Sequence, residues 1–154
     1  MKVYLDNCSY NRPFDDQNQM RIHLETQAKL FIQKLIRDGF LQLAISYISR
    51  YENWASPHSK NKITIEKFFE NAVTFVDIDK ANIVEENADT IMQSGIKAKD
   101  ALHIACAIEA MCDYFITTDD GILKKYRNGE IIVCSPIEFI NILEDFLCKQ
   151  RQPL

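Results

Sequence analysis

The sequence lacks any apolar run long enough to span a membrane, and its N-terminus lacks the apolar core of a signal peptide. Charged residues interrupt every apolar stretch well before the roughly 20 residues that a spanning helix needs. The chain begins MKVYLDN, which does not read as a targeting segment. We therefore expect a cytoplasmic protein.

The sequence also lacks several chemical signatures. It has no P-loop, no GxGxxG and no GxSxG, which argues against Walker-type nucleotide hydrolysis, dinucleotide redox chemistry and serine hydrolase chemistry. It has no CxxC pair, and its five cysteines are odd in number and scattered. This pattern does not indicate a zinc site or a disulfide framework. We expect reduced and mostly buried thiols at Cys8, Cys106, Cys112, Cys134 and Cys148.

An excess of positive charge is missing too. The 18 Lys and Arg residues against 22 Asp and Glu residues give a net charge of −4. Proteins that coat nucleic acid by bulk electrostatics are usually basic, so the charge argues against that class but leaves room for a local basic patch. With 154 residues, 47% hydrophobic and 26% charged, the chain fits one globular domain over residues 1–154.

What the sequence does contain is an alternation of strands and helices. Short apolar runs predict strands over 2–5, 41–46, 73–78, 114–118 and 131–134. Helical spacing predicts helices over 17–38, 47–54, 65–69, 81–93, 97–111 and 119–125, and a last one from Pro136, with a loop over 11–17. Continuous apolar strands that alternate with helices are typical of a parallel sheet. We expect an α/β fold with about five parallel strands and helices on both faces.

Three acidic residues lie where an expected strand ends or an expected helix begins. Asp6 follows the first strand, Asp119 follows the fourth, and Asp100 lies in the first turn of an apolar helix. Ligands of open α/β sheets bind at the carboxyl ends of the strands. If the first and fourth strands are neighbours, the carboxylates of Asp6 and Asp119 meet, and the three acids predict a metal site.

Each acid also has a purely structural interpretation. An Asp after a strand often forms an Asx-turn or caps a helix, and Asp120 is the likelier cap of the Asp119–Asp120 pair. The helix dipole alone favours an acid at Asp100. Glu52, one turn into the helix after the second strand, would point back to the same edge, although most helical glutamates are solvated. We interpret His103 as a helix histidine with satisfied hydrogen bonds rather than a ligand.

The order of these acids, with the segments KDALHIA and ITTDD, resembles a PIN domain nearly end to end. The NRPFDDQ segment over 11–17 resembles relatives of the VapC-type toxins of prokaryotic toxin–antitoxin pairs. The resemblance implies a three-layer PIN-like fold and a metal-dependent ribonuclease. It maps the four acidic positions of the family onto Asp6, Glu52, Asp100 and Asp119, the accompanying hydroxyl onto Thr117, and Asn7 beside the first acid.

The chemistry implied by the resemblance is phosphodiester hydrolysis by metal-activated water. Hard cations such as Mg²⁺ or Mn²⁺ prefer oxygen ligands. We expect one or two ions held by Asp6, Asp100 and Asp119, with Glu52 holding the second ion or orienting water. The resemblance also implies products with 5′-phosphate and 3′-hydroxyl ends, a cognate antitoxin partner, and a homodimer.

An RNA substrate needs cations and aromatic surfaces near the acids. Candidates for contact with the RNA backbone are Arg12, Lys97, Lys99, Lys124, Lys125 and Arg127. Tyr10, Phe14 and Trp54 are candidates for stacking on unpaired bases, whereas core packing is the alternative for Phe14 and Trp54.

Two other functions stay open. A phosphatase or phosphotransfer enzyme of another α/β class is one, although Asp6 lacks the DxD pairing expected of an aspartyl-phosphate nucleophile. The other is a catalytically weak or inactive PIN-fold module that binds RNA or protein. Metal binding without RNA cleavage would favour this module.

Overall fold

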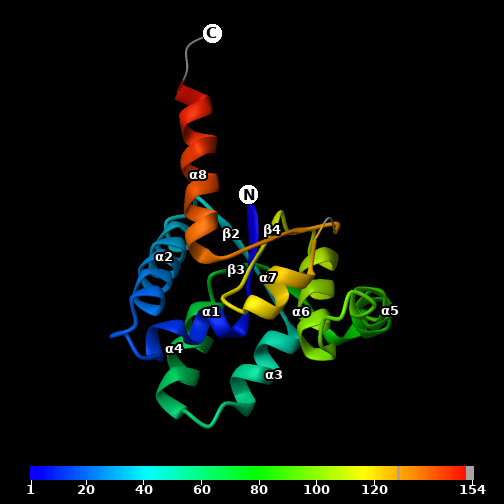
Figure 1. Cartoon of the computed structure of the whole chain (residues 1–154). Coiled ribbons are helices and arrows are strands. Elements are labelled where there is room, and N and C mark those ends of the chain that lie inside the picture. Colours follow the sequence, from blue (N-terminus) through cyan, green and yellow to red (C-terminus); the bar gives the residue numbers. More distant parts are fainter. Residues whose placement is uncertain (128, 152–154) are drawn as a thin grey trace.

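The computed structural model describes residues 1–127 and 129–151, and a five-stranded sheet forms its centre (Figure 1). The strands are β1 (Lys2–Leu5), β2 (Gln42–Ser46), β3 (Ala72–Val76), β4 (Tyr114–Ile116) and β5 (Ile132–Cys134). Their order is β3-β2-β1-β4-β5, and each neighbouring pair is parallel. The expected parallel α/β sheet is confirmed.

Most of the predicted helices are present, and three further short ones, over 7–11, 12–14 and 78–80, were not predicted. The helices are α1 (Asn7–Asn11), η1 (Arg12–Phe14), α2 (Met20–Arg37), α3 (Tyr47–Ala55), α4 (Ser59–Phe69), η2 (Ile78–Lys80), α5 (Ala81–Met92), α6 (Ala98–Glu109), α7 (Asp120–Lys125) and α8 (Pro136–Arg151). The loop expected over 11–17 contains η1, because Pro13 fits the first turn of a helix. α4 begins at Ser59, six residues earlier than expected, so the polar segment before Ile65 is helical.

Alternation along the strands produces two apolar faces, each with its own core. Val3 and Leu5 of β1 pack in one core, and Tyr4 between them packs in the other. Helices α1, α2, α4 and α8 contribute to the first core, whereas α5 and α6 contribute to the second. Because side chains point to alternate faces of a strand, the short apolar runs supply both cores at once.

The carboxyl ends of β1, β2 and β4 lie at one end of the sheet, where α1, α3 and α7 begin. Figure 1 shows α1 and α3 in the lower part of the molecule, while α8 extends beyond the opposite end. This arrangement brings the segments that carry the predicted acids to the same end. Within the described ranges, no helix combines the length and apolarity needed to cross a membrane.

All five cysteines lie in the described part of the chain and carry free thiols, as expected. Cys106, Cys112 and Cys134 are buried, Cys8 is half-buried and Cys148 is exposed. Burial raises the pKa of each of the three buried thiols, so they remain protonated and pack as small apolar groups.

Candidate active site

The first and fourth strands are neighbours in the sheet, as the metal-site prediction required. Leu5 of β1 pairs with Ile116 of β4, so Asp6 and Thr117 leave adjacent strand ends. The Thr117 hydroxyl donates a 2.8 Å hydrogen bond to Oδ2 of Asp6. Asp6 is only 5% exposed, and its Oδ1 accepts a 2.7 Å bond from the backbone N–H of Asn7. Asp6 is therefore both the cap of α1 and an acid fixed at the strand end.

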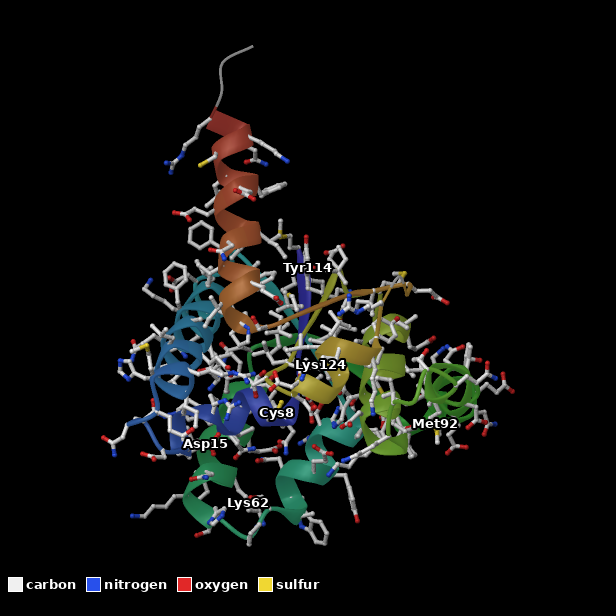
Figure 2. The ribbon with its side chains drawn as sticks, viewed as in Figure 1. Cys8, Asp15, Lys62, Met92, Tyr114 and Lys124 are labelled. Atoms are coloured by element: carbon white, nitrogen blue, oxygen red, sulfur yellow. The ribbon has the colours of Figure 1, made fainter. Side chains whose placement is uncertain are left out.

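Cys8 is a neighbour of this acid that the sequence did not identify. Its Sγ donates to Oδ2 of Asp6 at 3.1 Å and lies 3.2 Å from the Thr117 hydroxyl. Burial, and then the charge of Asp6, raises the pKa of Cys8 to about 12, so the thiol stays protonated and acts as a donor. Figure 2 marks Cys8 in this region of the molecule.

Asp119 follows β4 and caps α7. Its Oδ1 accepts bonds from the backbone N–H groups of Gly121 at 2.7 Å and Ile122 at 3.3 Å. The backbone N–H of Asp119 in turn donates to the Thr117 hydroxyl at 3.0 Å. One buried hydroxyl thus connects Asp6 to the backbone of Asp119, and the cap occupies only one carboxylate oxygen of Asp119.

The expectation that Asp120 is the helix cap was wrong. Asp119 has the extended backbone of a cap residue, whereas Asp120 is already the first residue of α7. Asp120 instead pairs with Arg21 of α2, whose two terminal nitrogens lie 2.8 Å and 2.7 Å from its carboxylate oxygens. Arg21 also pairs with the buried Glu25, so it connects the start of α7 to α2. No spacing in the sequence indicated this contact, because it joins residues 99 positions apart.

Asp100 lies in the first turn of α6 and is half-buried. Burial raises its pKa, and the charges of Asp6 and Asp119 raise it further. A nearby like charge disfavours the ionised form of a carboxyl group. The charges of Asp6 and Asp119 therefore act on Asp100, the third predicted acid.

Glu52 of α3 lies against two basic side chains of α6, Lys99 and His103. Its Oε1 lies 3.0 Å from Lys99 Nζ, and its Oε2 lies 3.1 Å from His103 Nε2. Both are ion pairs by distance, without the alignment of hydrogen bonds. Burial favours the neutral form of Glu52, but contacts with His103 and Lys99 outweigh it and lower its pKa. Glu52, which is 8% exposed, therefore stays ionised despite its burial.

His103 is only partly satisfied, contrary to expectation, because its buried Nε2 has no hydrogen-bond partner among the described residues. Its Nδ1 lies 2.8 Å from the hydroxyl of Tyr4, which also lies 2.7 Å from the hydroxyls of Ser46 and Ser49. Burial lowers the pKa of His103, but contact with Glu52 and the nearby carboxylates outweighs burial and raises it. Spacing in the sequence could have indicated some of these neighbours. Tyr4 comes two residues before Asp6, and side chains two apart along an extended segment point to the same side. Lys99 comes four residues before His103, and side chains four apart on a helix share a face.

The described residues contain no group of three or more His, Cys, Asp or Glu side chains arranged to hold a metal ion. Asp6 is bonded to Thr117 and Asn7, and Glu52 is paired with Lys99 and His103. The donors at this edge are nonetheless carboxylate oxygens, which is the chemistry that Mg²⁺ and Mn²⁺ prefer. The metal site remains a prediction.

The basic residues proposed for RNA contact differ in whether their side chains already have a partner within the protein. Arg12 donates to Glu25 and to Asp15, both at 3.0 Å, and Lys99 is paired with Glu52. Lys97 and Lys124 are exposed at the start of α6 and in α7. Lys125 and Arg127 donate to backbone carbonyls of Gly95 and Lys124. Their roles toward RNA remain predictions.

The aromatic candidates divide in an unexpected way. Tyr10 is 1% exposed and packs against Phe68 and Phe69, so it has no surface on which a base could stack. Phe14 is 45% exposed and Trp54 is 70% exposed, so core packing, the alternative for both, was wrong. Tyr51, also exposed, lies with its ring centroid 6.1 Å from that of Trp54. Amphipathic periodicity could not predict whether these side chains are buried, because it does not show which part of a helix packs against another element.

No family model and no curated protein matches the sequence. Among solved structures, a chain in the crystal structure of VapBC2 from Rickettsia felis bound to a DNA fragment from their promoter has a similar fold. The match covers 88% of this chain and 98% of that chain, with a TM-score of 0.53 and 18% sequence identity. At this identity the likeness is one of fold. It confirms the PIN-like fold, with helices on both faces of a parallel sheet, that the sequence predicts.

Proposed function

We propose that this chain is a divalent-metal-dependent endoribonuclease and the toxin of a toxin–antitoxin pair. The observation that carries the proposal is that the Thr117 hydroxyl connects Asp6 to the backbone of Asp119 at adjacent strand ends. Burial, and then the charges of these two acids, raises the pKa of Asp100. Uncompensated carboxylates that crowd together are costly unless a cation joins them. The similar fold of a VapBC2 chain supports the assignment to this class.

The carboxylate oxygens of these residues are the kind of donor that a hard cation prefers. Asp6, Asp100 and Asp119 would hold one or two Mg²⁺ or Mn²⁺ ions, with Glu52 at the border of the site. When bound, such an ion supplies positive charge near the scissile phosphate and activates water. Thr117 keeps Asp6 oriented, and Lys99 and His103 keep Glu52 ionised.

The substrate we propose is RNA with unpaired bases. Lys97 and Lys124 are exposed and would contact backbone phosphates near the acids. Tyr51 and Trp54 lie on the exposed side of α3, the helix that also carries Glu52, and would stack on bases. This combination of stacking and charge is typical of single-strand recognition.

A toxin of this kind requires partners. We propose a cognate antitoxin, because the neighbour of similar fold is part of a VapBC2 pair. We also propose a homodimer in the cytoplasm, where RNA is accessible. The C-terminal half of α8 carries the exposed side chains of Phe146 and Leu147, which a second protein chain would cover.

The decisive experiment compares wild-type protein with Asp100→Asn on a mixed pool of structured and single-stranded RNA. Each protein is incubated with Mg²⁺, with Mn²⁺ and with a chelator. We expect metal-dependent cleavage by wild type and a loss of at least about 100-fold in the variant. Asp89→Asn is the matched control, because Asp89 is exposed on α5 and should not affect cleavage. Cleavage retained by Asp100→Asn would exclude the proposed site.

Two further readouts separate the alternatives. Metal binding by calorimetry without any RNA cleavage would instead favour the inactive binding module. In chelator, Asp100→Asn should be more stable than wild type at pH 7, because the raised pKa of Asp100 means that its ionised form disfavours the folded state. That difference should vanish as the pH falls below the ordinary pKa of an aspartate, where both states are protonated.

A further inference from the structure

A cavity of about 710 Å³ lies between α1 with η1, α2 and α4. In Figure 1 these helices lie together at the left of the molecule. Tyr10, Phe14, Leu30, Ile65 and Phe68 supply aromatic and aliphatic walls. None of the four predicted acids lines this cavity. It is therefore separate from the proposed ribonuclease site and was not indicated by any motif.

Lys29 of α2 forms part of the cavity wall and is unusually buried for a lysine, with 4% of its surface exposed. Lysine side chains normally extend until the ammonium reaches water. Within residues 1–127 and 129–151, Nζ makes only a long hydrogen bond of 3.5 Å, to the carbonyl of Tyr10, and it lies 5.8 Å from the centre of that ring. Among the described residues it forms no ion pair, unlike Arg12 and Arg21 nearby in the chain.

Burying an amine without a counter-charge costs free energy, and most of this cost falls on the charged form. Burial, and then the charge of Arg37, lowers the pKa of Lys29 to about 7. The other charged groups around the cavity are Arg37 on α2, Lys67 on α4 and Glu70 at the end of α4. Three basic side chains and one acidic side chain thus line the cavity, so the cavity favours an anion. The apolar walls disfavour a bare phosphate or a ribose.

We propose that this cavity binds a small carboxylate carried on an apolar or aromatic body, with Lys29 as its counter-charge. The carboxylate lies against Nζ of Lys29, and the body packs on Phe14, Phe68 and Ile65. Binding supplies the partner that the buried amine lacks and covers apolar surface that the cavity leaves open. The site does not depend on the ribonuclease assignment.

The test uses the full chain and 4-phenylbutyrate as the probe, with 4-phenyl-1-butanol as its neutral counterpart. Titration calorimetry at pH 7.5 in two buffers of different ionisation enthalpy measures affinity and proton uptake. We expect the carboxylate to bind at least about tenfold more tightly than the alcohol. We also expect proton uptake, because Lys29 is partly neutral before binding, and a fall in affinity of about tenfold per pH unit above pH 7.

Variants assign the effect to Lys29. Lys29→Met should weaken phenylbutyrate by at least about tenfold and leave the alcohol unchanged. Lys34→Met is the matched control, because Lys34 is exposed on the same helix and paired with Asp38. Phe14→Ala should weaken both probes. Equal affinity for the acid and the alcohol, no binding at millimolar probe, or undiminished binding by Lys29→Met would each overturn the proposal.

Discussion

The hydroxyl of Tyr4 lies 2.8 Å from Nδ1 of His103, and both side chains are almost completely buried. On the other side of the imidazole, Nε2 faces the carboxylate of Glu52 at 3.1 Å. Tyr4 therefore fixes the orientation of the ring that keeps Glu52 ionised. The hydroxyls of Ser46 and Ser49 complete the contacts of Tyr4, so strand β1 reaches α3 and α6 through a single phenol.

Tyr4→Phe should destabilise the protein, because the two serines and the histidine would each lose a buried partner. We expect the free energy of unfolding to fall by about 1–3 kcal/mol. Tyr10→Phe is the matched control, since its equally buried hydroxyl has no hydrogen-bond partner among the described residues. Urea denaturation measures both, and Tyr10→Phe should be neutral or slightly stabilising. Equal losses in the two variants would show that the Tyr4 contacts contribute no more than apolar packing.

Thr117→Val should reduce divalent-ion affinity and RNA cleavage, because the hydroxyl connects Asp6 to the backbone of Asp119. By comparison with other residues that orient metal ligands, we expect a loss of about 10- to 100-fold. Thr117→Ser should restore most of the loss. Thr118→Val is the neighbouring control, since the Thr118 hydroxyl is buried without a hydrogen-bond partner in the described ranges. A similar loss in Thr118→Val would assign the effect to strand packing.

Lys29→Met should stabilise the ligand-free protein in a pH-dependent way. The pKa of Lys29 is lowered from an ordinary 10.5 to about 7 on folding, so the unfolded chain binds the extra proton between these values. Stability of the wild type should therefore rise as the pH increases from 7 toward 10.5, and the burial penalty is at most about 5 kcal/mol.

The measurement is the difference in unfolding free energy between Lys29→Met and wild type. Because other groups titrate in both proteins, only this difference isolates Lys29. The advantage of the variant should be largest at pH 6 and should decline by about 2–3 kcal/mol by pH 9. Lys34→Met should show no such trend. A constant difference across this range would mean that Lys29 keeps an ordinary pKa in the folded state.

The sequence predicted the layers of this protein well. Apolar runs of strand length and helical spacing led to five parallel strands and to helices on both faces, and the structure confirms both. Acids placed after the first and fourth strands indicated one edge of the sheet. These features are local, because a period of two or of 3.6 residues assigns each side chain to a face without reference to the rest of the chain.

Contacts between distant segments depended on the tertiary structure. Whether Asp6 meets Thr117 depends on β1 lying beside β4, and the pairing of Arg21 with Asp120 depends on α2 packing near α7. The sequence also did not predict the burial of Lys29 or the exposure of Trp54, because each depends on which helix packs against that side chain. The sequence by itself determined which residues share a face of each element. Only the packing of elements far apart in the chain decided which charges became partners, because ion pairs and hydrogen bonds require proximity in space that local periodicity does not encode.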